Sequence, residues 1–114
     1  ILNTASIGIC FVRERRIVRC NRRFEELHGY APGELIDLPT EVLYAHEADY
    51  RGVGEAYATL GAGRSYVATA LMRRKDGGTY WARVTGNAID AASPERGSVW
   101  LAEDITDRKR AEEE

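Results

Sequence analysis

Short apolar runs alternate with polar segments over the first 20 residues of the chain. Residues 7–12 read IGICFV, residues 13–16 are the polar segment RERR, and residues 17–20 read IVRC. Short runs rich in β-branched and aromatic residues, joined by a polar turn, are typical of a β-hairpin. We therefore predict two antiparallel strands in this part of the chain.

Helical spacing replaces the strand pattern after residue 20. Asn21 can cap the free N–H groups of a helix, and Gly29 is placed to end that helix. The residues between them form one stripe at three- and four-residue spacing: Phe24, Leu27 and His28.

Three more helical segments are predicted before the chain returns to strands. Residues 31–36 should form a short helix with Leu35 and Ile36 pointing inward, and Thr40 should cap a turn over residues 41–44. The longest helix is predicted for residues 49–60. Its apolar side chains share one side: Tyr50, Val53, Tyr57 and Leu60.

The last part of the chain predicts three strands, over residues 65–74, 79–89 and 98–104. Asp76-Gly77-Gly78 can form the tight turn between the first two, because glycine tolerates positive φ. Alternation places one set of side chains on the inner face: Tyr66, Ala68, Ala70, Met72, Tyr80, Ala82, Val84, Gly86, Ala88, Trp100 and Ala102.

The order of these elements predicts an α+β fold with an antiparallel sheet. It consists of two strands, a block of short helices, three strands and a final helix. The helices should cover one face of the sheet. The other face carries Trp81, Val99 and Leu101 and is too apolar for water. We expect a partner subunit or a flanking helix to cover it.

Composition narrows the function classes. The 114 residues are enough for one domain with one core, and the formal net charge of -2 argues against nucleic-acid binding. The chain has no apolar run near 18 residues and no signal peptide, so we expect a cytoplasmic domain without membrane contact. It starts without Met and stops in an acidic helix, which indicates a domain cut from a longer polypeptide.

The chemistry-bearing residues do not form a catalytic pattern. His28 and His46 have no Cys or Ser at a recognisable motif spacing, and residues 61–63 read as a helix stop rather than a phosphate loop. Cys10 and Cys20 lie in apolar strand-like runs, without a CxxC motif. We predict buried free thiols rather than a disulfide or metal site, no catalytic residue and no enzyme activity in this domain.

Four stretches together resemble the PAS domain family, the sensory box of bacterial signalling proteins. They are IVRCNRRFEELHGYAPGEL at residues 17–35, AHEAD at 45–49, RRKDGGTYWARV at 73–84 and EDITDRKRAEEE at 103–114. The resemblance implies an antiparallel sheet of about five strands in spatial order 2-1-5-4-3, with short helices on one face and a C-terminal exit helix. It divides the chain into a sensor domain, residues 1–104, and the start of a linker or coiled-coil helix, residues 105–114.

The resemblance also bears on cofactors. Flavin photoreceptors of the light-oxygen-voltage type carry a reactive Cys in their middle helices, and this chain has no Cys after Cys20. In haem-binding members the axial ligand position corresponds to Tyr50, for which a packing role is the simpler interpretation. We predict no cofactor and no metal, whereas a small organic ligand is compatible with the pocket. A sensor of light or gas that holds a non-covalent flavin or a haem is the less favoured alternative.

The small residues on the inner face allow two interpretations. They can leave room for a ligand, or they can let the helices and Trp100 pack tightly against the sheet. The ligand-pocket candidates are Phe24, His28, Tyr50, Val53, Tyr57, Tyr66, Ala68, Ala70, Met72, Ala82, Val84, Trp100 and Ala102.

Asp104-Ile105-Thr106 resembles the family's junction between last strand and exit helix. Thr106 or Asp104 can cap the new helix, and the Asp104 carboxylate can pair with an Arg from the domain body. Ile105 would begin a heptad seam. Glu103 departs from the family, in which Arg is frequent at this position.

These features predict a sensory and regulatory domain of a signal-transduction protein such as a two-component system. It would detect a small molecule or redox cue and act through the junction on an output domain in the same chain, such as a histidine kinase or cyclic-di-GMP enzyme. We expect a homodimer through the outer sheet face and the C-terminal helix. The alternative is a ligand-free module for dimerisation or protein interaction.

Overall fold

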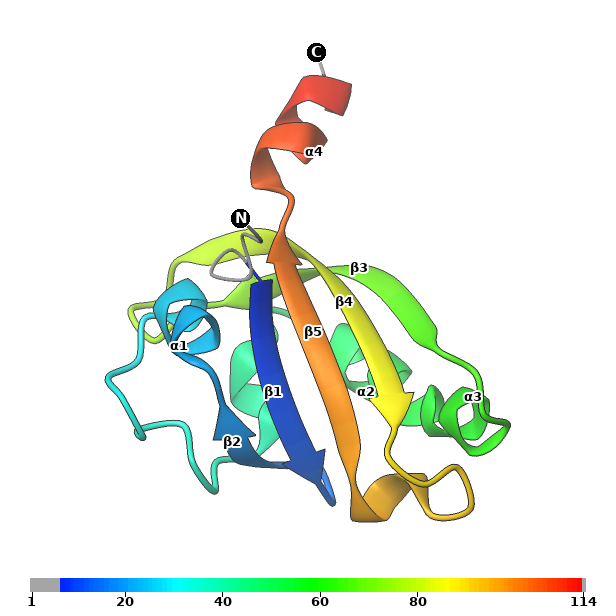
Figure 1. Ribbon diagram of the computed structural model, residues 1–114. Coiled ribbons are helices and arrows are strands. Elements are labelled where there is room, and N and C mark those ends of the chain that lie inside the picture. Colours follow the sequence, from blue (N-terminus) through cyan, green and yellow to red (C-terminus); the bar gives the residue numbers. More distant parts are fainter. Residues whose placement is uncertain (1–6, 114) are drawn as a thin grey trace, which may run out of the picture.

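The computed structural model describes residues 7–113 of the chain (Figure 1). The proposed start of the domain at residue 1 and residue 114 lie outside them. Its elements, in chain order, are β1 (Ile7–Arg13), β2 (Arg16–Cys20), α1 (Arg22–His28), the 3-10 helix η2 (Thr40–Leu43), α2 (Glu47–Glu55), α3 (Tyr57–Gly61), β3 (Tyr66–Arg73), β4 (Thr79–Ala88), the 3-10 helix η3 (Pro94–Arg96), β5 (Ser98–Asp104) and α4 (Thr106–Glu113).

The five strands form one antiparallel sheet in the order β2-β1-β5-β4-β3, as predicted. β5 is the central strand and pairs with β1 on one side and β4 on the other (Figure 1). The first and last strands of the chain therefore lie side by side in the sheet. α4 continues from β5 and projects away from the domain.

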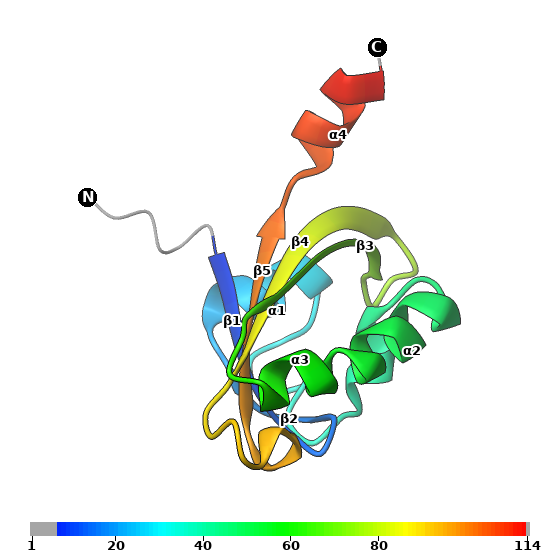
Figure 2. The same ribbon diagram turned by 90° about the vertical axis from the view of Figure 1, so that its right-hand side faces the viewer.

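The helices α2 and α3 lie on one side of the sheet (Figure 2). The inner face follows the predicted alternation. On β4, for example, Tyr80, Ala82, Val84 and Gly86 are buried and the residues between them are more exposed. The core between sheet and helices also includes Phe24, Leu27, Leu35, Val53 and Leu60.

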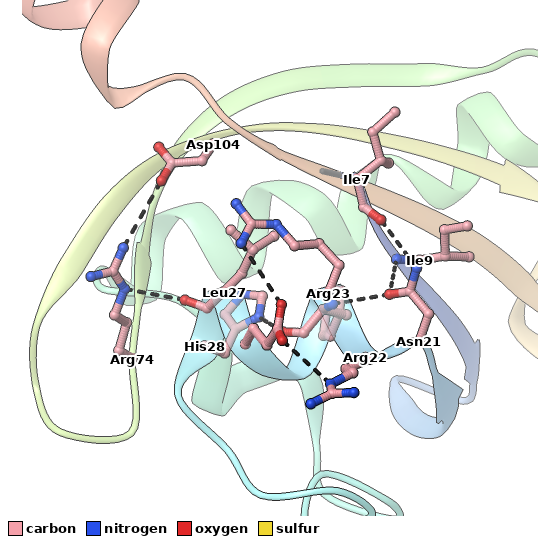
Figure 3. Close-up of polar contacts among 11 residues, drawn as sticks. Ile7, Ile9, Asn21, Arg22, Arg23, Leu27, His28, Arg74 and Asp104 are labelled. Atoms are coloured by element: carbon pink, nitrogen blue, oxygen red, sulfur yellow. Dashed lines mark hydrogen bonds and ion pairs between the residues drawn. The ribbon is translucent and has the colours of Figure 1, made fainter. Parts of the chain in front are cut away.

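Asn21 ties the first helix to the sheet. Its Oδ1 accepts hydrogen bonds from the N–H groups of Phe24 and Ile9, both at 2.9 Å, and its Nδ2 donates to the Ile7 carbonyl at 3.1 Å. The predicted cap is thus confirmed. The same side chain also fixes α1 against β1, because it satisfies backbone groups in both elements (Figure 3).

The prediction of a helix over residues 31–36 is wrong. Gly33 and Asp37 have φ angles of 79° and 70°, which a right-handed helix does not accommodate, and the segment forms consecutive turns. Leu35 is fully buried as expected, but Ile36 is 43% exposed. Thr40 is the first residue of η2 and does not cap it with its side chain.

The predicted long helix is interrupted at Ala56, which separates α2 from α3. α2 contains Gly52 and Gly54, and glycine weakens a helix interior. Gly54 has a packing reason, since a Cβ there would lie 2.6 Å from Nη1 of Arg15. The apolar side of the segment is still the predicted one, because Val53 and Leu60 are buried.

Gly86 makes room for the largest side chain of the inner face. A Cβ at this position of β4 would lie 2.4 Å from Cζ3 of Trp100, which pairs with Gly86 in the β4–β5 register. The indole ring therefore lies directly against the backbone of β4. This is the tight packing of Trp100 against the sheet that one of the two interpretations of the small residues predicts.

Candidate functional site

A small cavity lies between the inner face of the sheet and the helices. Its volume is about 30 Å³, which is room for one or two water molecules or a ligand of a few heavy atoms. The residues that line it are Cys10, Val12, Arg15, Phe24, Thr40, Tyr44, Val53, Tyr57, Met72, Val84, Trp100, Leu101 and Ala102.

The polar edge of the cavity is set by Arg15. This residue lies in the β1–β2 turn with a φ of 63°. Its Nη2 donates to the Tyr50 carbonyl at 2.9 Å, and its guanidinium carbon lies 3.9 Å from the centre of the Tyr50 ring. A cation over an aromatic face is held by the negative charge of the ring face. The β1–β2 turn therefore places a positive charge at the edge of the cavity.

Tyr44 and Thr40 add hydroxyl groups to the lining. Burial raises the pKa of the Tyr44 hydroxyl well above its ordinary value, and the positive charge of Arg15 opposes this only partly. Tyr44 is therefore a neutral phenol at physiological pH. The polar edge has hydrogen-bond donors and one positive charge, which suits a ligand with an accepting oxygen.

Trp100 forms one wall of the cavity and is only 8% exposed. Its Nε1 donates to Oγ of the buried Ser98 at 2.9 Å. The rings of Tyr57 and Tyr66 pack edge-on against it, with centroids 6.3 Å and 6.1 Å away. These contacts hold the indole in one orientation and reduce the volume that the small inner-face residues leave open.

Seven of the thirteen sequence candidates line the cavity. They are Phe24, Val53, Tyr57, Met72, Val84, Trp100 and Ala102. They come from α1, α2, α3, β3, β4 and β5, so the fold brings together residues far apart in sequence.

The other six candidates do not line the cavity, and for most of them a specific contact explains why the side chain lies elsewhere. They are His28, Tyr50, Tyr66, Ala68, Ala70 and Ala82. The Tyr50 ring lies against Arg15, and Tyr66 packs behind Trp100. Ala70 and Ala82 are both buried and face each other across β3 and β4.

Six lining residues were not among the candidates: Cys10, Val12, Arg15, Thr40, Tyr44 and Leu101. Cys10 and Val12 share inward parity in the first strand, so alternation alone could have identified them. Arg15 gave no such signal, because it is one of four residues in a polar turn. Its role depends on the turn geometry that aims it back toward α2.

His28 is a fully buried packing residue rather than a group at the cavity. Its Nδ1 is 2.8 Å from the Phe24 carbonyl, and its Nε2 is 2.9 Å from the Tyr80 hydroxyl. Burial lowers the pKa of His28 to about 4; the bond to the Phe24 carbonyl opposes this shift, and the charge of Arg74 adds to it. A neutral ring donates through Nδ1 and accepts from Tyr80 through Nε2, which satisfies both nitrogens.

The strand-to-helix junction is built around the Asp104 carboxylate. Its Oδ1 accepts from the Thr106 N–H at 2.9 Å and from the Thr106 hydroxyl at 2.6 Å. Thr106 Oγ1 accepts from the Trp81 N–H at 3.2 Å, and the Ile105 N–H donates to the Trp81 carbonyl at 2.9 Å. The hydrogen bonding between β4 and β5 therefore continues for one residue beyond Asp104, the last residue of β5.

Ile105 is 7% exposed and packs into the domain. It therefore anchors the junction and, in this arrangement, is not a free first position of a coiled-coil seam. α4 itself buries no residue, and Lys109 extends its ammonium over the Trp81 ring at 4.8 Å. The helix is held at its first turn and is open to solvent along the rest of its length.

Arg74 connects this junction to the domain body. Its Nη2 lies 4.0 Å from Oδ2 of Asp104, and its Nε donates to the Leu27 carbonyl at 3.1 Å (Figure 3). The predicted pairing of Asp104 with an Arg is thus confirmed. Leu27 lies in α1, one turn from Phe24 at the cavity wall. A short series of contacts therefore joins cavity, α1, Arg74 and exit helix.

A large cofactor does not fit the cavity as it stands. Sites that enclose drug-sized molecules have volumes of roughly 300–1,000 Å³, against about 30 Å³ here. The Tyr50 hydroxyphenyl group, at the expected haem-ligand position, lies against Arg15 rather than in the cavity.

Two general properties hold for residues 7–113. Nowhere in this range do three or more His, Cys, Asp or Glu side chains gather as a metal site would require. None of the helices in this range is both long enough and apolar enough to span a membrane.

Comparison with known proteins gives consistent matches. A family model described as PAS domain matches residues 6–107. The sensor protein TdiS of Thauera aromatica is 38% identical over 115 residues, which cover 100% of this chain and 21% of that protein. The chain thus spans about a fifth of the length of this relative.

Solved structures share the fold. The PAS domain of a LuxR-family transcriptional regulator from Burkholderia thailandensis, in complex with ethanol, has a TM-score of 0.79 and 33% identity, covering 87% of this chain and 88% of that one. A sensory box histidine kinase/response regulator from Burkholderia thailandensis E264 has a TM-score of 0.73 and 26% identity, covering 96% and 84%. A light-oxygen-voltage domain has a TM-score of 0.73 at 23% identity, with coverage of 96% and 86%, which shows a common fold only.

The buried His28 predicts a pH-dependent stability. Unfolded His has a pKa near 6.5, and in the fold it is about 4. Between these values the unfolded chain binds a proton that the folded chain does not, so stability falls as pH falls from about 6.5 to 4. A shift of this size corresponds to about 3 kcal/mol. Urea unfolding at several pH values measures it.

His28→Gln should be less stable at pH 7 and should lose this part of the pH slope. His46→Gln, at an exposed position, should keep the wild-type slope. Equal slopes for His28→Gln and the wild type would show that His28 does not cause the effect.

Proposed function

Since this chain belongs to the PAS domain family, we propose that it is a cytoplasmic, non-catalytic sensory domain that binds a small molecule between its sheet and its helices. Ligand binding changes the position of the junction formed by Asp104, Ile105 and Thr106. The junction transmits this change to an output domain in the same chain, such as a histidine kinase or a cyclic-di-GMP enzyme. The observation that carries this proposal is the interior cavity, which has an apolar wall and a charged, hydrogen-bonding edge.

The cavity chemistry limits the ligand class. Its volume of about 30 Å³ admits a few heavy atoms. Phe24, Val53 and Val84 offer apolar contacts, and Arg15 offers a positive charge and N–H donors. The proposed ligand is therefore a short molecule with an apolar part and a polar end that accepts hydrogen bonds, such as an alcohol or a carboxylate. The ethanol complex of the LuxR-family regulator's PAS domain is consistent with a ligand of this size.

Transmission follows from the contacts of Arg74. A ligand at Phe24 that favours one position of α1 also favours one position of the Leu27 carbonyl, to which Arg74 is bonded. Arg74 in turn faces the carboxylate that organises the first turn of α4. The domain would exchange between two arrangements of α1 and the exit helix. A ligand shifts the populations of the two arrangements only as far as its affinities for them differ.

Ethanol is a suitable probe for the cavity. At a ceiling of about 1.5 kcal/mol per heavy atom, three heavy atoms give a Kd no tighter than about 0.5 mM. We expect saturable amide shifts at cavity residues such as Val53 and Ala102 in an NMR titration. Val84→Ile, which adds one methyl group to the cavity wall, should weaken binding about tenfold or more.

Val67→Ile is the matched control, because Val67 is 52% exposed on β3 and should leave binding unchanged. Linear shifts spread over the surface, or equal binding by Val84→Ile and the wild type, would refute the small-ligand proposal. A visible absorption band in the purified domain would instead favour a coloured cofactor.

A second candidate function, dimerisation without a ligand, is favoured by the outer face of the sheet. Ile9 lies opposite Leu101, and Phe11 lies opposite Val99, which places four apolar side chains in one square across β1 and β5. Arg83 and Glu103 form a neighbouring cross-strand pair on the same face. A second copy of this chain, related by a two-fold axis, could pair its own charges with these two. We therefore propose that a second copy covers this face, with the α4 helices of both copies side by side.

Ile9→Lys tests this surface. We expect the wild type to form dimers at tens of micromolar in sedimentation experiments and Ile9→Lys to be monomeric, because the new charge would be buried in the interface. Ile36→Lys is the control at a 43% exposed position away from the sheet and should dimerise like the wild type. A monomeric wild type, or a dimeric Ile9→Lys, would exclude this interface.

A further inference from the structure

The β1–β2 hairpin brings the chain's two cysteines together. Cys10 and Cys20 are directly opposite in the antiparallel register, next to a bulge between Phe11 and Val12. Nine residues lie between them in sequence, an interval that matches no cysteine motif. The register of the hairpin, rather than the spacing, makes them neighbours.

The hydrogen bonding identifies the kind of pair. The Asn21 N–H donates to the Ile9 carbonyl at 2.9 Å, which makes the adjacent Cys10–Cys20 pair a non-hydrogen-bonded one. Cα atoms in such a pair lie about 4.5 Å apart, and disulfides join Cα atoms about 4.4–6.8 Å apart. Directly opposite residues also point to the same face of a sheet. The two sulfurs can therefore bond with only local adjustment of the hairpin.

The two thiols differ in access. Cys10 is 1% exposed and forms part of the cavity wall, whereas Cys20 is partly exposed on the edge strand β2. Burial and the nearby Glu25 carboxylate raise the pKa of Cys20 to about 11, and burial raises the pKa of Cys10 further. Both free thiols are therefore protonated at neutral pH, and Cys20 is the more accessible of the two to an oxidant.

We propose that Cys10 and Cys20 form a reversible intramolecular disulfide by exchange with a low-molecular-weight disulfide such as oxidised glutathione. The Cys20 thiolate attacks one glutathione sulfur, the glutathione S–S bond breaks, and one glutathione leaves as thiol. The Cys10 thiolate then attacks Cys20 Sγ in the mixed disulfide and releases the second glutathione. Two protein thiols are oxidised, and one glutathione disulfide is reduced to two thiols.

The bond would couple the redox state to the rest of the domain. It would lock β2 to β1, which pairs directly with the central strand β5. It would also convert a thiol of the cavity wall into a disulfide. This second consequence rests on the proposed ligand site, whereas formation of the bond does not.

The test is oxidation of the folded protein with oxidised glutathione at mildly alkaline pH, followed by trapping with N-ethylmaleimide and intact-mass measurement. We expect the wild type to lose the mass of two hydrogens, take up no maleimide, stay monomeric on a non-reducing gel and return to the dithiol with dithiothreitol. A stable glutathione adduct, an intermolecular disulfide or two maleimide-labelled thiols would overturn the proposal.

Three variants sharpen the test. Cys10→Ala should retain glutathione on Cys20, since no second thiol can displace it. Cys20→Ala should react at least tenfold more slowly than the wild type, because Cys10 is buried. Arg19→Cys in the Cys20→Ala background places a thiol opposite Phe11, on the other face. It should form no intramolecular disulfide, and a disulfide there as fast as in the wild type would show that register is not the cause.

Discussion

The position of β5 is the constraint on which the domain depends. It is the central strand, with ladder partners on both sides over nearly its whole length. It cannot slide against one neighbour without breaking the ladder to the other, and a shift of one residue would turn its inner side chains outward. The same strand carries Trp100 at the cavity wall and Asp104 at the exit. One strand therefore carries both a wall of the cavity and the start of the exit junction.

On β5, Trp100 lies at the cavity wall and Asp104 lies at the end of the proposed signalling route. The indole needs glycine at position 86, because any larger residue would collide with the ring. The carboxylate organises Thr106 at the start of α4 and faces Arg74. α4 is short and buries no residue, so its stability depends on these end contacts.

The sequence predicted the features that depend on local pattern. Strand alternation gave the inner face, Asn21 and Gly29 marked the ends of α1, and the resemblance gave the strand order. What it could not predict depends on tertiary geometry. Arg15 reaches the cavity only because its turn folds back toward α2. Likewise, the Cys10–Cys20 pair exists only in the hairpin register. The error at residues 31–36 has a local origin, since left-handed residues at Gly33 and Asp37 prevent a helix.

The central claim is that the domain body and the exit helix are energetically coupled through Arg74 and Asp104. A double-mutant cycle with Arg74→Gln and Asp104→Asn tests it, read out by amide exchange at Lys109, whose N–H donates to the Ile105 carbonyl at 2.9 Å in the first turn of α4. Asparagine keeps an acceptor for Thr106 and removes only the charge. The account predicts a coupling energy of about 0.5–1 kcal/mol, as expected for a partly exposed pair. Strictly additive effects of the two substitutions would contradict it.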